Sequence, residues 1–391
     1  MANNNNKFYI LQILETKASP KKYYVFYRWG RVGRKGSQKL IPFGTDMAAA
    51  MGEFEDKLED KTVNGSYIEL DLAFDEENEL KNKQNMEEAG ATSSLDPRVN
   101  ELIKLLFDIK IMKSTMQSIG YDAEKMPLGK LSLQAIENGY GILKDLNEEL
   151  KKTKPKRHIV EELSSMFYTQ IPHDIGFKSM RNMLIKTEEM VKEKSDFLGI
   201  LSNMKITRNI VDGQDTTKNV IEANYESLKN RIEPVERNTS TYKMIEEYIK
   251  NGKCPGHSYY ELELLDVFSL ERESEAEKFK SEMPNKMLLW HGSRLTNFVG
   301  LLSQGIKIAP PEAPVTGYMF GKGAYFTDMV TKSANHCHHS MSNDIGFLIL
   351  AEVALGETND LLHADYNASN LPEGKQSTKG CGSFGPKESN F

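Results

Sequence analysis

One stretch of this 391-residue sequence, from Leu288 to Phe326, contains a histidine near its start and a tyrosine near its end. Both residue types are suited to chemistry. His291-Gly292-Ser293 follows the apolar run Met287–Trp290, and such a run is typical of a strand buried on both faces. A polar ring and a glycine at the end of a buried strand leave backbone groups open to a flat ligand. Tyr325 lies in Ala324–Phe326, which we expect to form a second, aromatic strand. The corner and this strand together predict a cleft.

Each of the two residues also has a structural interpretation, and for either one alone that interpretation is the more common. His291 could satisfy a hydrogen bond in the core, and Tyr325 could be ordinary packing. The Gly-rich segment Gly317–Gly323 resembles a phosphate-binding loop, but its glycine spacing is one residue short and no Ser or Thr follows Lys322. No helix follows these glycines, so the segment is not a dinucleotide fingerprint. The absence of a Rossmann fingerprint disfavours an NAD-dependent dehydrogenase.

Several elements must position the cleft. Apolar residues at helical spacing predict a helix over Thr296–Gln304, and Gly305 stops it. A Pro-rich loop, Ala309–Pro314, comes next. Alternation predicts a strand over Tyr259–Phe268, and the apolar run Ile345–Leu355 predicts a central strand. Strands dominate from about Pro234 onward, so we expect an α+β unit there.

Length and composition fit a soluble protein of two or three domains. The sequence has no apolar run of membrane-spanning length and no signal-peptide pattern at its start, and its three cysteines are too few for a disulfide framework. These features favour a reduced, intracellular protein. Cys337 lies among His336, His338 and His339, but no second ligand pair stands nearby at zinc-finger spacing, so we expect no metal.

The N-terminal region is basic although the whole chain carries a net charge of −6. Lys17 to Lys39 contains eight Lys or Arg and no acid, and local potential decides attraction to phosphates. Alternation over Lys22–Arg28 predicts a strand with Tyr24, Phe26 and Arg28 on one face. Trp29-Gly30-Arg31 follows and suits stacking on a base or sugar with a phosphate contact, although a turn with a half-buried Trp is the plainer alternative. We expect a helix over Asp46–Leu58 and a last strand over Gly65–Leu70.

An acidic, polar segment from Asp75 to Ser94 has the composition of a linker. Helical periodicity then runs from Leu95 to about Ile232. It begins at Pro97 and predicts further helices over Ser132–Lys151, His158–Phe167 and Ser179–Ile210. Lys151–Arg157 (KKTKPKR) is equally compatible with a nuclear import signal and a solvated interhelical loop.

Three segments resemble, in order, the domains of the DNA-dependent poly(ADP-ribose) polymerases. HGS at 291–293, APPEAPVTGYMFGKG at 309–323 and YF at 325–326 resemble the catalytic domain. MPLGKLS at 126–132 and IPHD at 171–174 resemble the helical regulatory domain, and Trp29-Gly30-Arg31 resembles the WGR domain. The resemblance implies a multidomain chain with these ranges: a small α+β WGR domain at 1–75, an acidic linker at 76–94, an all-α regulatory domain at 95–232 and an α+β ADP-ribosyltransferase domain at 233–391, incomplete at its C-terminus.

The resemblance also implies an activity, partners and site residues. The activity is transfer of ADP-ribose from NAD⁺, which is a substrate, to protein side chains when damaged or nicked DNA is bound in the nucleus. No membrane is involved. His291 and Tyr325 would be catalytic, and NAD⁺ would also contact Gly292, Ser293, Gly300, Lys307, Lys332, Ser333 and His336. Within this set Gly292 and Ser333 would bond the carboxamide, Tyr325 would stack on nicotinamide and His291 would hold the adenine-side ribose. DNA would contact Trp29, Gly30, Arg31, Arg34 and Lys35.

The catalytic region departs from the family pattern at three places. Lys307 stands where the family usually has Arg, and His336 stands where it usually has Tyr, so we expect weaker nicotinamide binding. The family's catalytic Glu near the C-terminus has no counterpart before Phe391, since neither Glu373 nor Glu388 has a strand-like context. Two functions therefore stay open: an active transferase, and a catalytically impaired scaffold that binds DNA breaks.

Overall fold

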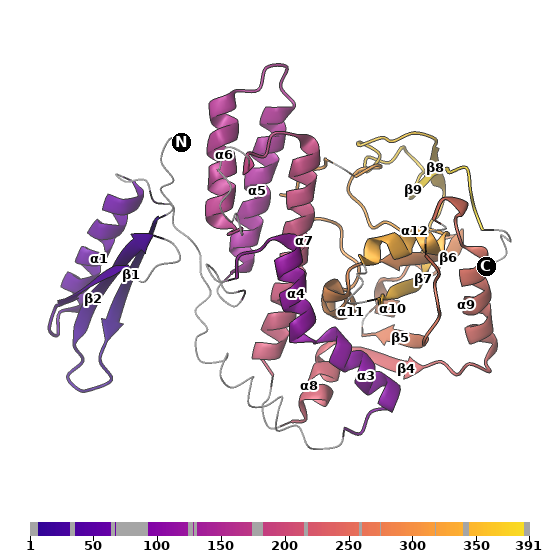
Figure 1. Ribbon diagram of the computed structural model, residues 1–391, viewed down its shortest axis with the longest axis horizontal. Coiled ribbons are helices and arrows are strands. Elements are labelled where there is room, and N and C mark those ends of the chain that lie inside the picture. The colour runs from indigo at the N-terminus through magenta and orange to yellow at the C-terminus, as the bar shows by residue number, and fades with distance from the viewer. Residues whose placement is uncertain are drawn as a thin grey trace.

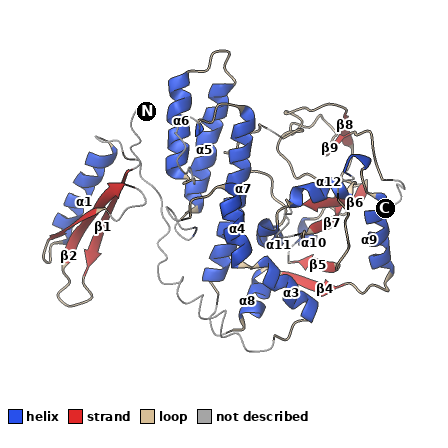
Figure 2. Ribbon diagram, in the orientation of Figure 1, coloured by secondary structure: helices blue, strands red, loops and turns tan. Residues whose placement is uncertain are grey.

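The computed structural model describes residues 7–31, 36–63, 67, 93–123, 128, 131–173, 183–214, 218–257, 260–273, 275–316, 318–338 and 344–386 (Figure 1). Strands occur in the N-terminal unit and in the C-terminal part of the chain, and a group of helices lies between them in sequence (Figure 2). This distribution confirms the predicted multidomain class of α+β, all-α and α+β units. None of the described helices combines the length and the apolar character that crossing a bilayer requires.

The N-terminal unit is an antiparallel sheet, ordered β1-β2-β3, that packs against one helix. Its elements are β1 (Lys7–Glu15), β2 (Tyr23–Arg31), β3 (Ser37–Pro42) and α1 (Met47–Thr62). Val25 and Tyr27 alternate along β2 onto the buried face, where they meet Ala50 of α1. The strand predicted over Lys22–Arg28 is therefore confirmed, and the predicted helix extends to Thr62. The expected last strand over Gly65–Leu70 lies outside the described residues except for Tyr67.

The middle of the chain is helical, as predicted. The helices are α3 (Pro97–Leu106), α4 (Ile109–Ile119), α5 (Leu133–Leu150), α6 (Arg157–Gln170), α7 (Glu188–Asp212) and α8 (Val220–Ser227). Their main core is an apolar cluster that includes Leu143 and Leu146 of α5, Phe167 of α6 and Leu201 of α7, all buried. Lys151–Arg157 forms the connection between α5 and α6, with Arg157 as the first residue of α6.

The helix predicted over Ser179–Ile210 starts later than expected. Residues 179–182 lie outside the described part, and α7 begins at Glu188. The side chain of Thr187 accepts a hydrogen bond from the N–H of Met190 at 3.2 Å, and Glu188 and Glu189 occupy the first turn. A capping hydroxyl followed by acidic residues favours a helix start at this point, because both interact with the free N–H groups there.

The C-terminal unit is built from short strands and short helices. Its described elements are β4 (Asn230–Pro234), α9 (Ser240–Asn251), η3 (Pro255–His257), β5 (Phe268–Arg272), α10 (Glu275–Lys278), β6 (Lys286–Gly292), η4 (Leu295–Asn297), α11 (Phe298–Gln304), α12 (Val330–Ala334), η5 (Asn335–Cys337), β7 (Leu348–Ala354), β8 (Thr358–Leu361) and β9 (Ser377–Gly380). The strands pair as β4-β5 and β6-β7, both antiparallel, and as β8-β9, parallel. The predicted helix over Thr296–Gln304 is confirmed as η4 and α11, and the apolar run Ile345–Leu355 contains β7.

Two strand predictions in this unit are wrong. From Tyr260 to Val267 the chain forms no ladder, and β5 begins only at Phe268. The alternation there has another cause, since Leu262 and Leu264 pack against the apolar cluster that contains Trp290, while Glu261 and Glu263 are exposed. Ala324–Phe326 is not a strand either. Its only ladder contact in the described chain is the bridge that follows at Thr327, whose N–H and C=O bond Trp290 at 3.0 and 2.8 Å.

The helical and C-terminal units share their cores. Val99 and Ile103 of α3 belong to the same buried cluster as Phe298 and Val299 of α11. Ala313, from the loop after α11, is 2% exposed and packs in the core of the helical unit. Because apolar residues of both units are buried against each other, moving the helices must disturb the elements around the predicted cleft.

Candidate active site

The strand that carries His291 is fixed from both sides. In β6 the ladder with β7 places His291 opposite Ile349, and Trp290 bonds to Thr327 on the other side. Trp290 is 3% exposed and its ring lies 5.3 Å from that of Tyr248. The apolar run predicted as a buried strand is therefore part of β6, and His291 and Gly292 are the last two residues of this fixed strand.

His291 and Tyr325 lie next to each other. Nδ1 of His291 is 2.9 Å from the backbone carbonyl oxygen of Tyr325. Nδ1 therefore carries the proton that it donates to this carbonyl. The other ring nitrogen, Nε2, makes no hydrogen bond to the residues that the structure describes, so it can serve a ligand. The two predicted catalytic residues thus share one side of the same corner.

The side chain of Tyr325 is held by its hydroxyl and exposed at its ring. The hydroxyl donates to the carbonyl of Gly321 at 2.6 Å and accepts from the N–H of Phe320 at 3.0 Å. Partial burial raises the pKa of this phenol, so it stays protonated at neutral pH. The residue is 40% exposed, which leaves the ring accessible for stacking.

Gly292 and Ser333 are in direct contact at the base of the corner. A Cβ atom added to Gly292 would lie 1.9 Å from the carbonyl oxygen of Ser333, so no other residue fits there without displacing α12. The hydroxyl of Ser333 is buried and donates to the carbonyl of Trp290 at 3.0 Å. Since its proton is used in this bond, Ser333 can offer a ligand only an acceptor lone pair.

The other predicted NAD⁺ contacts are more dispersed. Oγ of Ser293 accepts from Nδ2 of Asn297 at 2.9 Å. Lys307 is exposed and donates to Oε1 of Gln304, and Lys332 is exposed on α12. Gly300 is buried in α11 and faces the regulatory helix, because a Cβ atom there would lie 2.4 Å from Oδ1 of Asn203. Its lack of a side chain admits α7, a role that the sequence did not suggest.

His336 lies within the electrostatic reach of His291. Burial lowers the pKa of His336, and His291, Lys192 and Lys332 lower it further, while Asp196 opposes them. His336 is therefore neutral at neutral pH, which suits a flat ring that is to stack on an uncharged nicotinamide. The charges of Lys192 and Asp196 come from α7 and show that this helix faces the site.

Helix α7 touches the site through an ion pair that the sequence did not reveal. Nζ of Lys192 is 2.7 Å from Oδ2 of Asp196 and lies 5.6 Å from the centroid of the Tyr318 ring. The Tyr318 ring lies 6.2 Å from that of Tyr325. Burial lowers the pKa of Arg294, the residue after Ser293, and the negative charge of Asp196 opposes this shift. Asp196 therefore interacts with Arg294 as well as with Lys192.

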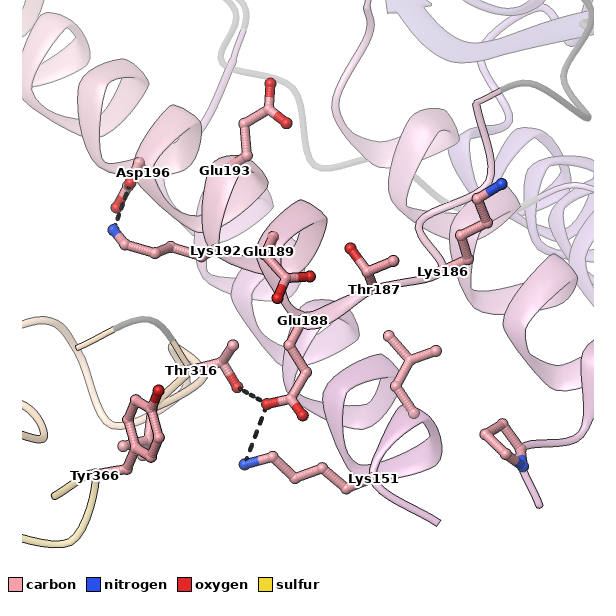
Figure 3. Close-up of a pocket in the computed structure, with 13 residues that line it drawn as sticks. Lys151, Lys186, Thr187, Glu188, Glu189, Lys192, Glu193, Asp196, Thr316 and Tyr366 are labelled. Carbon is pink, nitrogen blue, oxygen red and sulfur yellow. Dashed lines mark hydrogen bonds and ion pairs between the residues drawn. The ribbon is translucent and has the colours of Figure 1, made fainter. Parts of the chain in front are cut away.

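The loop between α11 and Tyr325 is bonded to the helices by Thr316. Its Oγ1 lies 2.6 Å from Oδ1 of Asn147 on α5 and 3.1 Å from Oε2 of Glu188 on α7. Figure 3 shows Thr316 and Lys151 approaching the same Glu188 carboxylate at the edge of a cavity of about 750 Å³. Thr316 and Asn147 are buried, at 7% and 6% exposure, so this contact is protected from water. Asn147 lies on the buried face of α5, at helical spacing after Tyr140 and Leu143. A polar residue at an otherwise apolar, buried position is the one sequence signal that could have revealed this contact.

In the N-terminal unit the predicted DNA-binding Trp is partly exposed. The Trp29 residue is 36% exposed, and its ring stacks on Tyr9, with the ring centroids 5.9 Å apart. Gly30 allows the backbone at Gly36 to approach closely, because a Cβ atom at Gly30 would lie 2.7 Å from Cα of Gly36. The side chain of Arg31, and Arg34 and Lys35 entirely, lie outside the described part. Trp29 therefore offers one open edge of an aromatic pair on β1 and β2.

The described residues contain no group of three His, Cys, Asp or Glu placed to hold a metal ion. The arrangement on the page is instead a half-open aromatic corner. It combines backbone groups at the end of β6, the neutral rings of Tyr325 and His336 and a ring nitrogen on His291. These are groups that hold a flat heteroaromatic amide by stacking and hydrogen bonding.

Known protein families match the chain in three successive ranges. The WGR domain matches residues 1–71, the poly(ADP-ribose) polymerase regulatory domain matches residues 93–225, and the poly(ADP-ribose) polymerase catalytic domain matches residues 239–391. The chain therefore combines a WGR domain, a poly(ADP-ribose) polymerase regulatory domain and a poly(ADP-ribose) polymerase catalytic domain, in this order.

Named relatives agree with this class over nearly the whole chain. Poly(ADP-ribose) polymerase 2 of Zea mays is 41% identical over 401 residues, which are 99% of this chain and 61% of the relative. Poly(ADP-ribose) polymerase 2 of Homo sapiens is 39% identical over 406 residues, covering 99% and 69%. Poly(ADP-ribose) polymerase 1 of Danio rerio is 41% identical over 399 residues, covering 97% and 38%. The chain belongs to the poly(ADP-ribose) polymerase family, and it spans 61% of the length of the maize relative.

Proposed function

We propose that this chain transfers ADP-ribose from NAD⁺ to protein side chains in the nucleus, and that DNA breaks activate it. The observation that carries the proposal is the contact of His291 with the backbone of Tyr325. It brings the two residues predicted to grip NAD⁺ to one corner, in a domain that matches the family's catalytic domain.

The geometry suits rupture of the bond between nicotinamide and ribose. That step passes through an oxocarbenium-like state, as in glycoside hydrolysis, so the site must hold the leaving group still. The Tyr325 ring would stack on nicotinamide, and the backbone of Gly292 and the lone pair of Ser333 would bond its carboxamide. Nε2 of His291 would hold a hydroxyl of the adenine-side ribose.

Regulation by DNA would pass through the helical unit. Trp29 and its basic surroundings would bind a DNA break, as expected of a WGR domain. Helices α5 and α7 grip the catalytic loop through Thr316, and α7 presents Lys192 and Asp196 to the site. Loosening of these helices would free both the loop and the entrance to the site.

The test is incubation of the chain with labelled NAD⁺ and an acceptor protein, with and without nicked DNA. The proposal expects label on protein, more of it with DNA, and none in His291→Ala. If the wild-type chain labels protein equally with and without DNA, the claim that DNA breaks activate it fails. Salt-sensitive DNA binding without any label would instead support the scaffold function.

A further inference from the structure

We propose that Lys322 is a positioning residue of the nicotinamide site, which closes the loop from Ala309 to Lys322 and thereby fixes Tyr325. The inference rests on the proposed function, because it concerns the same corner. Lys322 itself bonds to the backbone of the loop and acts on a ligand through Tyr325.

The ammonium group of Lys322 joins the end of the loop to its beginning. Nζ donates to the carbonyl of Pro310 at 2.7 Å and to the carbonyl of Pro311 at 3.1 Å. The Pro310 carbonyl also accepts from the N–H of Ala313 at 3.0 Å, so the first turn of the loop and its last residue meet at one oxygen. Hydrogen bonds from a charged donor are stronger than neutral ones, which makes this closure a firm one.

The closure is transmitted to Tyr325 through the peptide before Lys322. The Tyr325 hydroxyl donates to the carbonyl of Gly321 and accepts from the N–H of Phe320. Gly321 has a φ of +72°, and a Cβ atom there would lie 2.9 Å from the backbone nitrogen of Ser369, so this segment cannot shift freely. The residue that ends the loop therefore sets the anchor of the stacking ring.

The surroundings of Lys322 explain why its charge needs these carbonyls. Partial burial lowers the pKa of Lys322, and Lys144 on α5 lowers it further, while Glu312 opposes them. A partly buried ammonium beside another cation requires acceptors, and the two proline carbonyls supply them. The lysine between two glycines, which looks like part of a phosphate loop in the sequence, is thus bonded to the protein's own backbone.

The experiment compares Lys322→Met, which keeps the aliphatic stem, with Lys322→Arg, which can again donate to both carbonyls. Lys253→Met, at an exposed lysine of the same unit, is the matched control. Nicotinamide affinity is measured by calorimetry, and amide hydrogen exchange follows the loop and the β6-β7 ladder. Loss of two charge-assisted bonds predicts about tenfold weaker nicotinamide binding in Lys322→Met. We expect faster exchange at Phe320 and unchanged exchange in β6, recovery in Lys322→Arg, and no effect in Lys253→Met.

Two results overturn the role of Lys322: wild-type affinity in Lys322→Met, or loss of protection that extends equally through β6 and β7, which would mean general destabilisation. If the wild-type chain itself binds no nicotinamide, the proposed function fails. The exchange at Phe320 then still decides whether Lys322 fixes the Tyr325 anchor.

Discussion

Nδ1 of His291 and the backbone carbonyl oxygen of Tyr325 lie 2.9 Å apart, although 34 residues separate the two in the sequence. The bond uses the backbone of Tyr325, so it locks the position of the chain and leaves the aromatic ring exposed for a ligand. It also fixes the tautomer of His291, with the proton on Nδ1 and an acceptor at Nε2.

Substitution of His291 should separate its structural bond from its binding role. In His291→Asn the side-chain amide can still donate to the Tyr325 carbonyl, whereas His291→Ala loses that bond as well. We expect both variants to bind NAD⁺ at least about tenfold more weakly, and only His291→Ala to lose about 1 kcal/mol of unfolding free energy. Calorimetry with NAD⁺ and urea unfolding measure the two effects. Full NAD⁺ affinity in His291→Asn would exclude a role for Nε2.

Gly292→Ala should damage the base of the site. The new methyl group would meet the carbonyl oxygen of Ser333, so β6 or α12 must move, at a cost of about 1–3 kcal/mol. Thermal unfolding of the variant is the measurement, with Gly323→Ala as control, because a Cβ atom at Gly323 has nothing within 4 Å. Equal melting temperatures for Gly292→Ala and the control would show that the contact is not tight.

Thr316→Val should weaken the link between the regulatory helices and the catalytic loop. The substitution keeps the shape but removes the hydroxyl that bonds Asn147 and Glu188. Because Asn147 is buried, its unpaired side-chain oxygen costs about 1–3 kcal/mol. We expect transfer from NAD⁺ in the absence of DNA to increase, with little change when DNA is present. Thr316→Ser, which retains the hydroxyl, should behave as wild type. A fall in both activities would mean that the contact supports the site and does not restrain it.

Acidification should destabilise the chain through His336. Its pKa lies below the ordinary value of 6.5, so between the two values the unfolded chain binds more protons than the folded one. This contribution to stability is therefore complete above pH 6.5 and falls as the pH drops toward the lower, folded-state pKa. His336→Gln removes the titrating ring. Its melting temperature should therefore fall less than that of wild type when the pH drops from 7.5 to 5.5, a range of about two pH units around the ordinary histidine pKa. Parallel curves would contradict the shift.

Trp29 should contribute to DNA binding by stacking. Its ring already lies against Tyr9 and is partly exposed, and one base–aromatic stack is worth about 1–3 kcal/mol. Trp29→Ala should therefore weaken binding to a nicked duplex about fivefold to a hundredfold, while Trp29→Phe retains most of the affinity. Fluorescence anisotropy at several salt concentrations measures this. Unchanged binding in Trp29→Ala would assign the Trp to packing of the sheet alone.

Local sequence signals predicted most of the elements but not the contacts between units. The apolar runs that became β6 and β7, and the helical period of α5, are set by burial on a regular backbone, which periodicity reports directly. The alternation over Tyr259–Phe268 misled because a segment with one apolar face looks the same whether or not a strand pairs with it. Asn147, Thr316 and Lys322 were missed as functional residues because each depends on a partner far away in the sequence.

The central claim is that the corner formed by His291 and Tyr325 accepts a nicotinamide ring. A crystal structure of the chain soaked with nicotinamide tests it most directly. We predict that the ring lies against Tyr325 with its carboxamide at the backbone of Gly292. A ring bound elsewhere, or a corner filled by the protein's own side chains in crystals that hold nicotinamide at saturation, would contradict the account.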